Sequence, residues 1–121
     1  MRVRKSTIIR KLMPLAEAKT KIYNKSLKKN LEITAKGVKE TANHASKSKP
    51  STLAALDAKS QLRKAVVVKR TATHSNNQNN LKFSEMIVMR GEHEGNPTKV
   101  TVGRKRTDRH LLYCITAKKK K

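Results

Sequence analysis

Hydrophobic positions follow a helical period in the first half of the chain and a strand period in the second half. From Pro14, which suits the first turn of a helix, apolar residues recur at steps of mostly four or seven: Leu15, Ile22, Tyr23, Leu27 and Leu31. Gly37 is suited to end such a helix. The sequence therefore predicts a basic arm over residues 1–13 and one long helix over residues 14–37.

A short second helix is predicted after a polar gap. Residues 38–50 are small, polar and basic, which favours a linker or a loop that orders on binding. Ser51 is then a good N-cap, and Leu53, Leu56 and Leu62 follow at helical spacing. These positions predict a helix over about residues 52–64.

The period changes to two after Ala65. Four segments rich in β-branched or alternating apolar residues predict strands, over 65–74, 81–90, 98–103 and 111–116. Polar stretches over 75–80 and 91–97 predict the turns between the first three, and short connections favour antiparallel neighbours. The segment LLYCIT is apolar on both faces, which indicates a central strand.

Together these elements predict an α+β fold. It consists of a long basic N-terminal helix or arm, one short helix, and then a small three- to four-stranded antiparallel sheet. Residues 1–50 form the arm, helix and linker, and whether they order only on binding is left open. Residues 51–117 form a small α+β body, and residues 118–121 form a basic tail.

The charge of the chain indicates its partner. Thirty Lys and Arg residues stand against eight Asp and Glu, a net charge of +22, whereas solubility needs only about 2–8 charges on a small domain. Phosphate backbones neutralise such an excess, and binding them releases counterions. Lys outnumbers Arg, which favours contacts to the backbone over reading of base edges.

The sequence therefore predicts a non-enzymatic nucleic-acid-binding protein. RNA within a ribonucleoprotein such as a ribosome, together with other proteins of that assembly, is favoured over DNA of the nucleoid, phage or plasmid type. The candidate phosphate-binding residues are Arg2, Arg4, Lys5, Arg10, Lys11, Arg63, Lys64, Lys69, Arg70, Arg104, Lys105, Arg106, Arg109, Lys118, Lys119, Lys120 and Lys121.

The stretch GRKRTDRHLLYC, Gly103 to Cys114, also admits a catalytic interpretation. His110 would be a general acid–base, Arg109 or Arg106 would stabilise a pentacovalent phosphate, and Glu85 or Glu94 would be the second acid–base group. The ten residues from Arg104 to Tyr113 resemble a C-terminal strand of small bacterial ribonuclease toxins of the RelE and barnase type. That resemblance implies, as an alternative function, a metal-independent ribonuclease with His110 at its centre. Those toxins are richer in aromatic residues and do not end in four lysines.

Several classes of site and protein are disfavoured by the residues that are scarce. With one cysteine and no metal-ligand spacing among four histidines, the sequence predicts no disulfide, metal or cofactor. The three aromatic residues Tyr23, Phe83 and Tyr113 are expected in the core, which disfavours binding by base stacking. No apolar run approaches the roughly 18 residues of a membrane span, so no membrane partner is predicted. A cytoplasmic or other reducing, nucleic-acid-containing compartment is expected.

Overall fold

The structure is a computed structural model that describes residues 2–72, with only the backbone of Arg2, and residues 83–118. In these ranges the chain forms the helices α1 (Arg2–Glu17), α2 (Ala35–Ala45), α3 (Lys49–Leu56) and α4 (Ala58–Lys64). It also forms the strands β1 (Lys21–Asn24), β2 (Lys29–Glu32), β3 (Val66–Ala72), β4 (Glu85–His93), β5 (Asn96–Arg104) and β6 (His110–Ala117).

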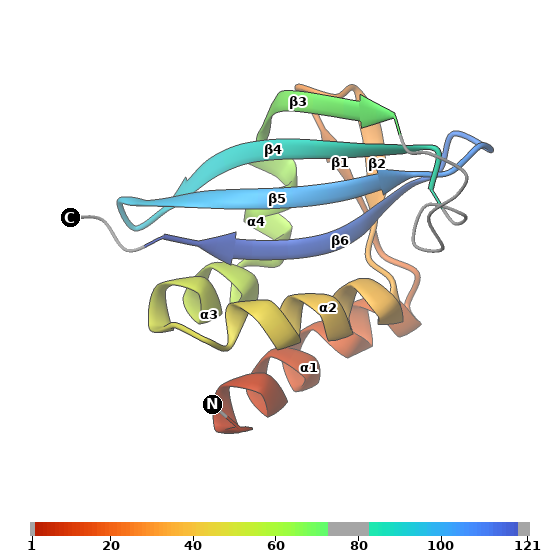
Figure 1. Cartoon of the computed structure of the whole chain (residues 1–121). Coiled ribbons are helices and arrows are strands. Elements are labelled where there is room, and N and C mark those ends of the chain that lie inside the picture. The colour runs from red at the N-terminus through yellow and green to blue at the C-terminus, as the bar shows by residue number, and fades with distance from the viewer. Residues whose placement is uncertain (1, 73–82, 119–121) are drawn as a thin grey trace.

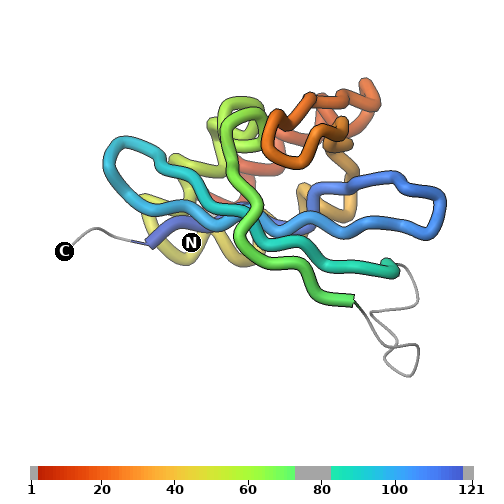
Figure 2. The backbone as a smooth tube through the Cα atoms, turned by 90° about the horizontal axis from the view of Figure 1, so that it is seen from above, coloured from red at the N-terminus to blue at the C-terminus, as the bar shows by residue number. Residues whose placement is uncertain are grey.

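The strands form one curved, mixed sheet in the order β1-β2-β6-β5-β4-β3. All neighbours are antiparallel except β2 and β6, which run parallel over a short register from Leu31 opposite His110. Strands β3 to β6 run across the molecule, and β1 and β2 rise behind them (Figure 1). Seen from above, the turn between β4 and β5 and the loop between β5 and β6 lie at opposite ends of the molecule (Figure 2). The sheet is thus a half-barrel with β1 and β3 as its two edges.

The core lies between one face of this sheet and the helices. Alternating positions of the strands, among them Met89, Val100 and Ile115, are fully buried against α2, α3 and α4. The helices contribute mostly small residues: Ala42, Ala45, Ala54, Ala55 and Ala58. Because alanine has a small side chain, these helices can approach the larger buried side chains of the strands closely. Helix α1 packs beneath α2, on the side away from the sheet (Figure 1).

The predicted arm and long helix at the N-terminus are wrong. Residues 2–17 are helix α1, whose Ile8 and Leu12 are buried in the core. Residues 21–32 form a β-hairpin, because Leu31 packs into the core and Asn24 is held by bonds to a distant segment. These tertiary contacts override the local helix propensity of a Lys- and Leu-rich segment.

The predicted linker over 38–50 is also wrong. Thr34 caps α2 by accepting a hydrogen bond from the amide of Gly37, and Val38 and Ala42 on that helix are buried. The predicted helix over 52–64 is present as two helices, α3 and α4, separated at Asp57. Its N-cap is Ser48 rather than Ser51, with Pro50 in the first turn.

The chain is α+β, but the predicted three- to four-stranded antiparallel sheet is wrong, because the sheet already has six strands within the described residues and is mixed. The prediction missed β1 and β2, which extend the sheet beyond β6. The predicted strands over 65–74, 81–90, 98–103 and 111–116 correspond to β3 to β6, although residues 73–82 lie outside the described ranges. Strand β6 is central, as its two apolar faces predicted. The predicted loop over 91–97 is instead a tight turn at Glu94 and Gly95, both with positive φ.

Candidate nucleic-acid interface

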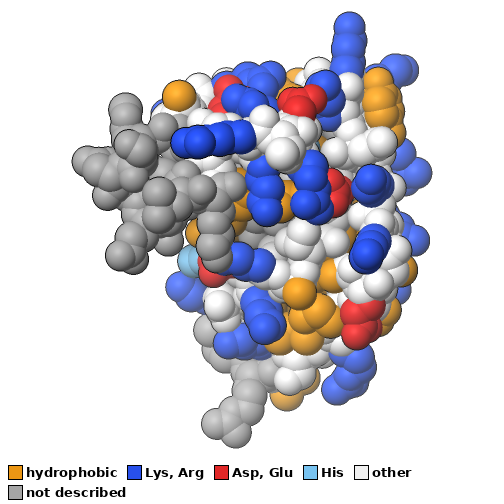
Figure 3. Space-filling view, turned by 90° about the vertical axis from the view of Figure 1, so that its right-hand side faces the viewer, with side chains coloured by type: hydrophobic (Ala, Val, Ile, Leu, Met, Phe, Trp, Pro, Cys, Tyr) orange, Lys and Arg blue, Asp and Glu red, His pale blue; other side chains and the backbone are white. Residues whose placement is uncertain are grey.

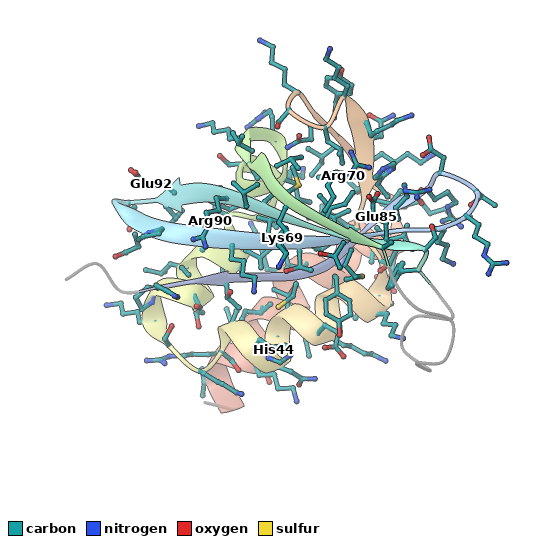
Figure 4. All side chains as sticks on the ribbon, turned by 45° about the horizontal axis from the view of Figure 1, so that its top comes forward. His44, Lys69, Arg70, Glu85, Arg90 and Glu92 are labelled. Atoms are coloured by element: carbon teal, nitrogen blue, oxygen red, sulfur yellow. The ribbon has the colours of Figure 1, made fainter. Side chains whose placement is uncertain are left out.

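Four cationic side chains line one shallow hollow on the face of the sheet that is turned away from the helices. They are Lys69 of β3, Arg90 of β4, Lys99 of β5 and Lys118, which follows β6. Met89 and Val100 point into the core, so their neighbours Arg90 and Lys99 point outward. The hollow measures about 330 Å³, and Figure 4 shows Lys69 and Arg90 on this face. We call these four residues the basic sheet face.

The charges of the basic sheet face are not compensated within the described residues. Arg90 and Lys99 are direct partners across β4 and β5, and like charges placed opposite each other destabilise a sheet. No carboxylate of residues 2–72 or 83–118 forms an ion pair with any of the four cations. A bound anion would relieve the repulsion.

A second basic hollow lies between β1 and the junction of α4 with β3. Lys21 and Lys25 stand on one side and Arg63 and Lys64 on the other, and its volume is about 870 Å³. Tyr23 and Val66 also line it and are both 54% exposed. We call this hollow the Tyr23 groove, lined by Lys21, Tyr23, Lys25, Arg63, Lys64 and Val66.

Buried hydrogen bonds hold the two walls of the Tyr23 groove together. The side-chain amide of Asn24 donates to the carbonyl oxygens of Leu62 and Ala65, at 2.7 and 2.8 Å. The hydroxyl of Ser26 accepts a 3.0 Å hydrogen bond from the amide of Val67. The two edge strands of the half-barrel are thereby linked at one end.

The two basic hollows adjoin at the start of β3. Val66 lines the Tyr23 groove and is the register partner of Arg90, which belongs to the basic sheet face. Val66 and Arg90 therefore bring the edges of the two hollows next to each other at the start of β3.

Two arginines predicted as phosphate contacts are instead neutralised around Glu85. Arg70 donates two hydrogen bonds to this carboxylate, at 2.7 and 3.1 Å, and Arg104 donates a third, at 3.0 Å. The hydrogen bonds from Arg70, with further help from Arg104, lower the pKa of Glu85 to about 2. Figure 4 shows Arg70 and Glu85 side by side near one end of the sheet.

The end of β5 and the loop before β6 carry four cations predicted to contact phosphate, Arg104, Lys105, Arg106 and Arg109, which we call the clamp. Part of this clamp is paired inside the protein. Arg109 forms a forked pair with Glu32, at 2.7 and 3.1 Å, which lowers the pKa of that carboxyl group. Asp108 pairs with Lys29 at 2.7 Å. Of the clamp, only Lys105 and Arg106 have no ion-pair partner among the described residues.

The family is shown by comparison with known proteins. Residues 1–113 match the model of the large polyvalent protein-associated domain 3. The chain belongs to this family. The matched residues include the whole Tyr23 groove and three of the four cations of the basic sheet face, leaving out Lys118. No curated protein and no solved structure matches the chain.

The cations of helix α1 in this polyvalent protein-associated domain line neither hollow. On this helix, which lies beneath α2 in Figure 1, Arg4 is half-buried and Lys5, Arg10 and Lys11 are exposed. The side chain of Arg2 and the lysines Lys119, Lys120 and Lys121 lie outside the described part of the structure. The face that carries the β5–β6 loop shows Lys and Arg side chains spread among a few carboxylates (Figure 3).

The residues of the catalytic interpretation are not arranged as a free site. His110 is buried, and its burial lowers the pKa of the imidazole, so the neutral form is favoured. Glu85 is held by two arginines and Arg109 by Glu32. Glu94 lies in the turn at one end of the β4–β5 hairpin. The other end of that hairpin carries Glu85 opposite Arg104, and Arg104 is the register partner of His110, so Glu94 is far from His110. A role for His110 in RNA cleavage stays a prediction.

The sequence prediction did not name Arg90 and Lys99 of the basic sheet face, or Lys21, Lys25 and Tyr23 of the Tyr23 groove, as candidate binding residues. The alternation of Arg90 with Ile87 and Met89 was a usable signal, but the pairing of Arg90 with Lys99 needs the register. Tyr23 was expected in the core, which is wrong, because it lies on the outward side of an edge strand.

Neither a metal cluster nor a membrane span is found where the structure is described. Residues 2–72 and 83–118 contain no group of three or more His, Cys, Asp or Glu side chains able to hold a metal. None of the helices in these ranges is long and apolar enough to cross a membrane.

Proposed function

We propose that this domain binds nucleic acid through the phosphate backbone and that the basic sheet face is its main contact. The observation that carries the proposal is the pairing of Arg90 with Lys99 across two strands, without a compensating carboxylate among the described residues. Such an arrangement lowers the stability of the free protein and becomes favourable when an anion binds.

The class of anion follows from the amount and kind of charge. A net charge of +22 over 121 residues far exceeds what one small anion neutralises, whereas a polyanion supplies many charges and releases counterions. Lysine dominates the charge, and the basic sheet face contains three lysines and one arginine. Mobile ammonium groups suit backbone phosphates of any sequence. RNA in a ribonucleoprotein and DNA both present this backbone, and RNA is favoured here as the partner.

The test is a binding titration of RNA and DNA oligonucleotides by fluorescence anisotropy at several salt concentrations. The triple variant Lys69→Gln, Arg90→Gln, Lys99→Gln should bind more weakly, and its slope of log K against log salt should fall by roughly 2–3. The matched control is Lys5→Gln, Arg10→Gln, Lys11→Gln, which removes three exposed charges from α1. This control should lose clearly less affinity than the sheet-face variant.

Two results would overturn the proposal. The first is an affinity for nucleic acid that stays flat between low and physiological salt, because backbone binding depends steeply on salt. The second is an equal loss in the two triple variants, which would show that the charge acts diffusely and that the sheet face has no special part. Circular dichroism and thermal melts of each variant establish that folding is intact.

A further inference from the structure

The Tyr23 groove contains an exposed aromatic ring between four cations. Tyr23 is 54% exposed, and its hydroxyl has no hydrogen-bond partner within residues 2–72 and 83–118. A tyrosine ring is usually buried, or the tyrosine hydroxyl forms a hydrogen bond. A tyrosine with neither feature has its ring available for a ligand. Val66, equally exposed, adds an apolar surface beside it.

The cations of the groove flank the ring on both walls. Lys21 shares the outward side of β1 with Tyr23, Lys25 follows in the hairpin turn, and Arg63 and Lys64 stand across at the end of α4. Among the described residues, no acidic side chain lines the groove. The ligand that this combination suits has a flat apolar part with negative charges on either side, and an unpaired nucleotide within a strand has that chemistry.

We infer that the Tyr23 groove receives an unpaired base of a single-stranded nucleic acid, which stacks on the Tyr23 ring. This inference rests on the proposed function, because the rest of the strand continues over the basic sheet face where Val66 meets Arg90. A duplex keeps its bases stacked inside the helix and cannot offer one to the ring. The domain therefore binds single strands more tightly than duplexes of equal charge.

The groove is better suited to a nucleotide than to an added protein strand. Strand β1 has four residues, and Lys21 lies at its start with Lys25 directly after its end. Lysines on a short edge strand protect it against pairing with another chain. An acidic peptide remains the competing ligand and is included in the test.

The two tyrosines of the chain allow a direct spectroscopic test. The protein has no tryptophan, so in the variant Tyr113→Phe the ultraviolet emission reports on Tyr23 alone. A single-stranded oligonucleotide should quench this emission on binding. An abasic strand of the same length, which keeps the phosphates and lacks the bases, should bind more weakly and leave most of the emission.

Substitution of Tyr23 separates stacking from charge. Tyr23→Leu keeps an apolar side chain without a ring and should lower single-strand affinity about 5- to 100-fold, with duplex affinity changed less than about twofold. Tyr23→Phe keeps the ring and should bind single strands within about twofold of the unsubstituted protein. The slope of log K against log salt should stay constant in both, because neither variant removes a charge.

The outcomes distinguish this inference from the proposed function. The inference is overturned if Tyr23→Leu binds single strands normally, or if normal and abasic strands bind equally well. In either case, a salt-dependent loss of affinity in the sheet-face variant still upholds the proposed function. If polyglutamate restores Tyr23 emission by displacing the strand at equal charge concentration, the groove belongs to an acidic protein segment, and the inference is likewise overturned. If no nucleic acid binds at low salt, both proposals fail.

Discussion

At the scale of single residues, Gly37 is needed for the close contact between α2 and β6, although glycine has a low helix propensity. It lies in the first turn of α2, where a Cβ would overlap the backbone carbonyl oxygen of Leu112 on β6. Helix propensity alone predicts that Gly37→Ala gains about 1 kcal/mol. We expect instead a loss of about 1–3 kcal/mol, because the helix must move away from the sheet. Urea unfolding measures the change.

The matched control for Gly37 is Ala35→Gly in the same turn of α2. Ala35 is exposed, so this variant should cost no more than the helix-propensity difference of about 1 kcal/mol. A Gly37→Ala protein as stable as the unsubstituted chain would show that α2 and β6 are not in tight contact.

Glu85 should make the stability of the protein depend on pH in the acid range. Its pKa in the folded state is about 2, below its ordinary value of 4.5, because Arg70 and Arg104 hydrogen-bond to the carboxylate. The unfolded chain binds the proton first as pH falls, so the stabilisation is complete above about pH 4.5 and is lost towards pH 2. Urea unfolding between pH 7 and pH 2.5 measures this loss.

The variant Glu85→Gln isolates that contribution from those of the other carboxylates. It should be less stable than the unsubstituted protein at pH 7, because two arginines lose their shared partner. The difference should shrink as the pH falls below 4.5. A difference that stays constant down to pH 2.5 would contradict the ion-pair origin of the low pKa.

At the scale of elements, the β1–β2 hairpin depends on Asn24 for its position. The side chain is fully buried and bonds to Leu62, Ala65 and the amide of Leu27. Asn24→Ala leaves these backbone groups without partners and should lower the free energy of unfolding by about 2–4 kcal/mol. Because the same bonds hold the walls of the Tyr23 groove, single-strand affinity should fall with stability.

Asn30→Ala is the control for this element. Asn30 is exposed on β2, opposite Tyr23, so its loss should change stability by less than about 0.5 kcal/mol. Equal stability of the two variants would show that the hairpin is held by other contacts.

The strands β3 to β6 could be predicted from the sequence, and the N-terminal elements could not. Alternation marks residues such as Ile87 and Met89 without knowledge of what packs on them. The hairpin of β1 and β2 has no such local mark, because it is fixed by long-range bonds from Asn24 and by pairing of Leu31 with His110. Helix α2 was missed because its buried face is made of glycine, alanine, threonine and one valine, which weakens the apolar period.

The kind of site stays a prediction, and the sequence named only some of the cations that line the two hollows. The charge excess points to a phosphate-rich partner, and Lys69 and Lys118 were named from sequence alone. Arg104 and Arg109 stand in the most basic run of the chain but are paired with Glu85 and Glu32, which lie 19 and 77 residues away in sequence. Only the fold shows which cations are ion-paired with a carboxylate of the protein and which can contact an external anion.

At the scale of the whole molecule, stability and anion binding are opposed. The folded chain concentrates a net charge of +22 in 121 residues. Self-repulsion of this size lowers the stability of the compact state, and salt or a bound polyanion relieves it. The cations that bind most strongly should therefore also be the ones that cost most when nothing is bound.

Lys99→Gln tests this opposition at the position where two cations face each other. Removing the charge opposite Arg90 should raise the free energy of unfolding at low salt by about 0.2–1 kcal/mol. The gain should shrink at about 0.3 M salt, because screening already weakens the repulsion. The same variant should bind nucleic acid more weakly, so stability and affinity change in opposite directions.

Thermal melts at two salt concentrations and anisotropy titrations measure the two effects of Lys99→Gln. The control is Lys39→Gln, which removes an exposed charge from α2 at a site with no cation opposite it on a neighbouring strand. Both variants lower the net charge by one, so they gain equally from weaker overall repulsion. An extra gain in Lys99→Gln at low salt therefore measures the repulsion between Lys99 and the other cations of the basic sheet face, among which Arg90 is its direct cross-strand partner. If the two variants melt together and bind alike, the facing cations carry no special cost, and the basic sheet face loses the observation on which its role depends.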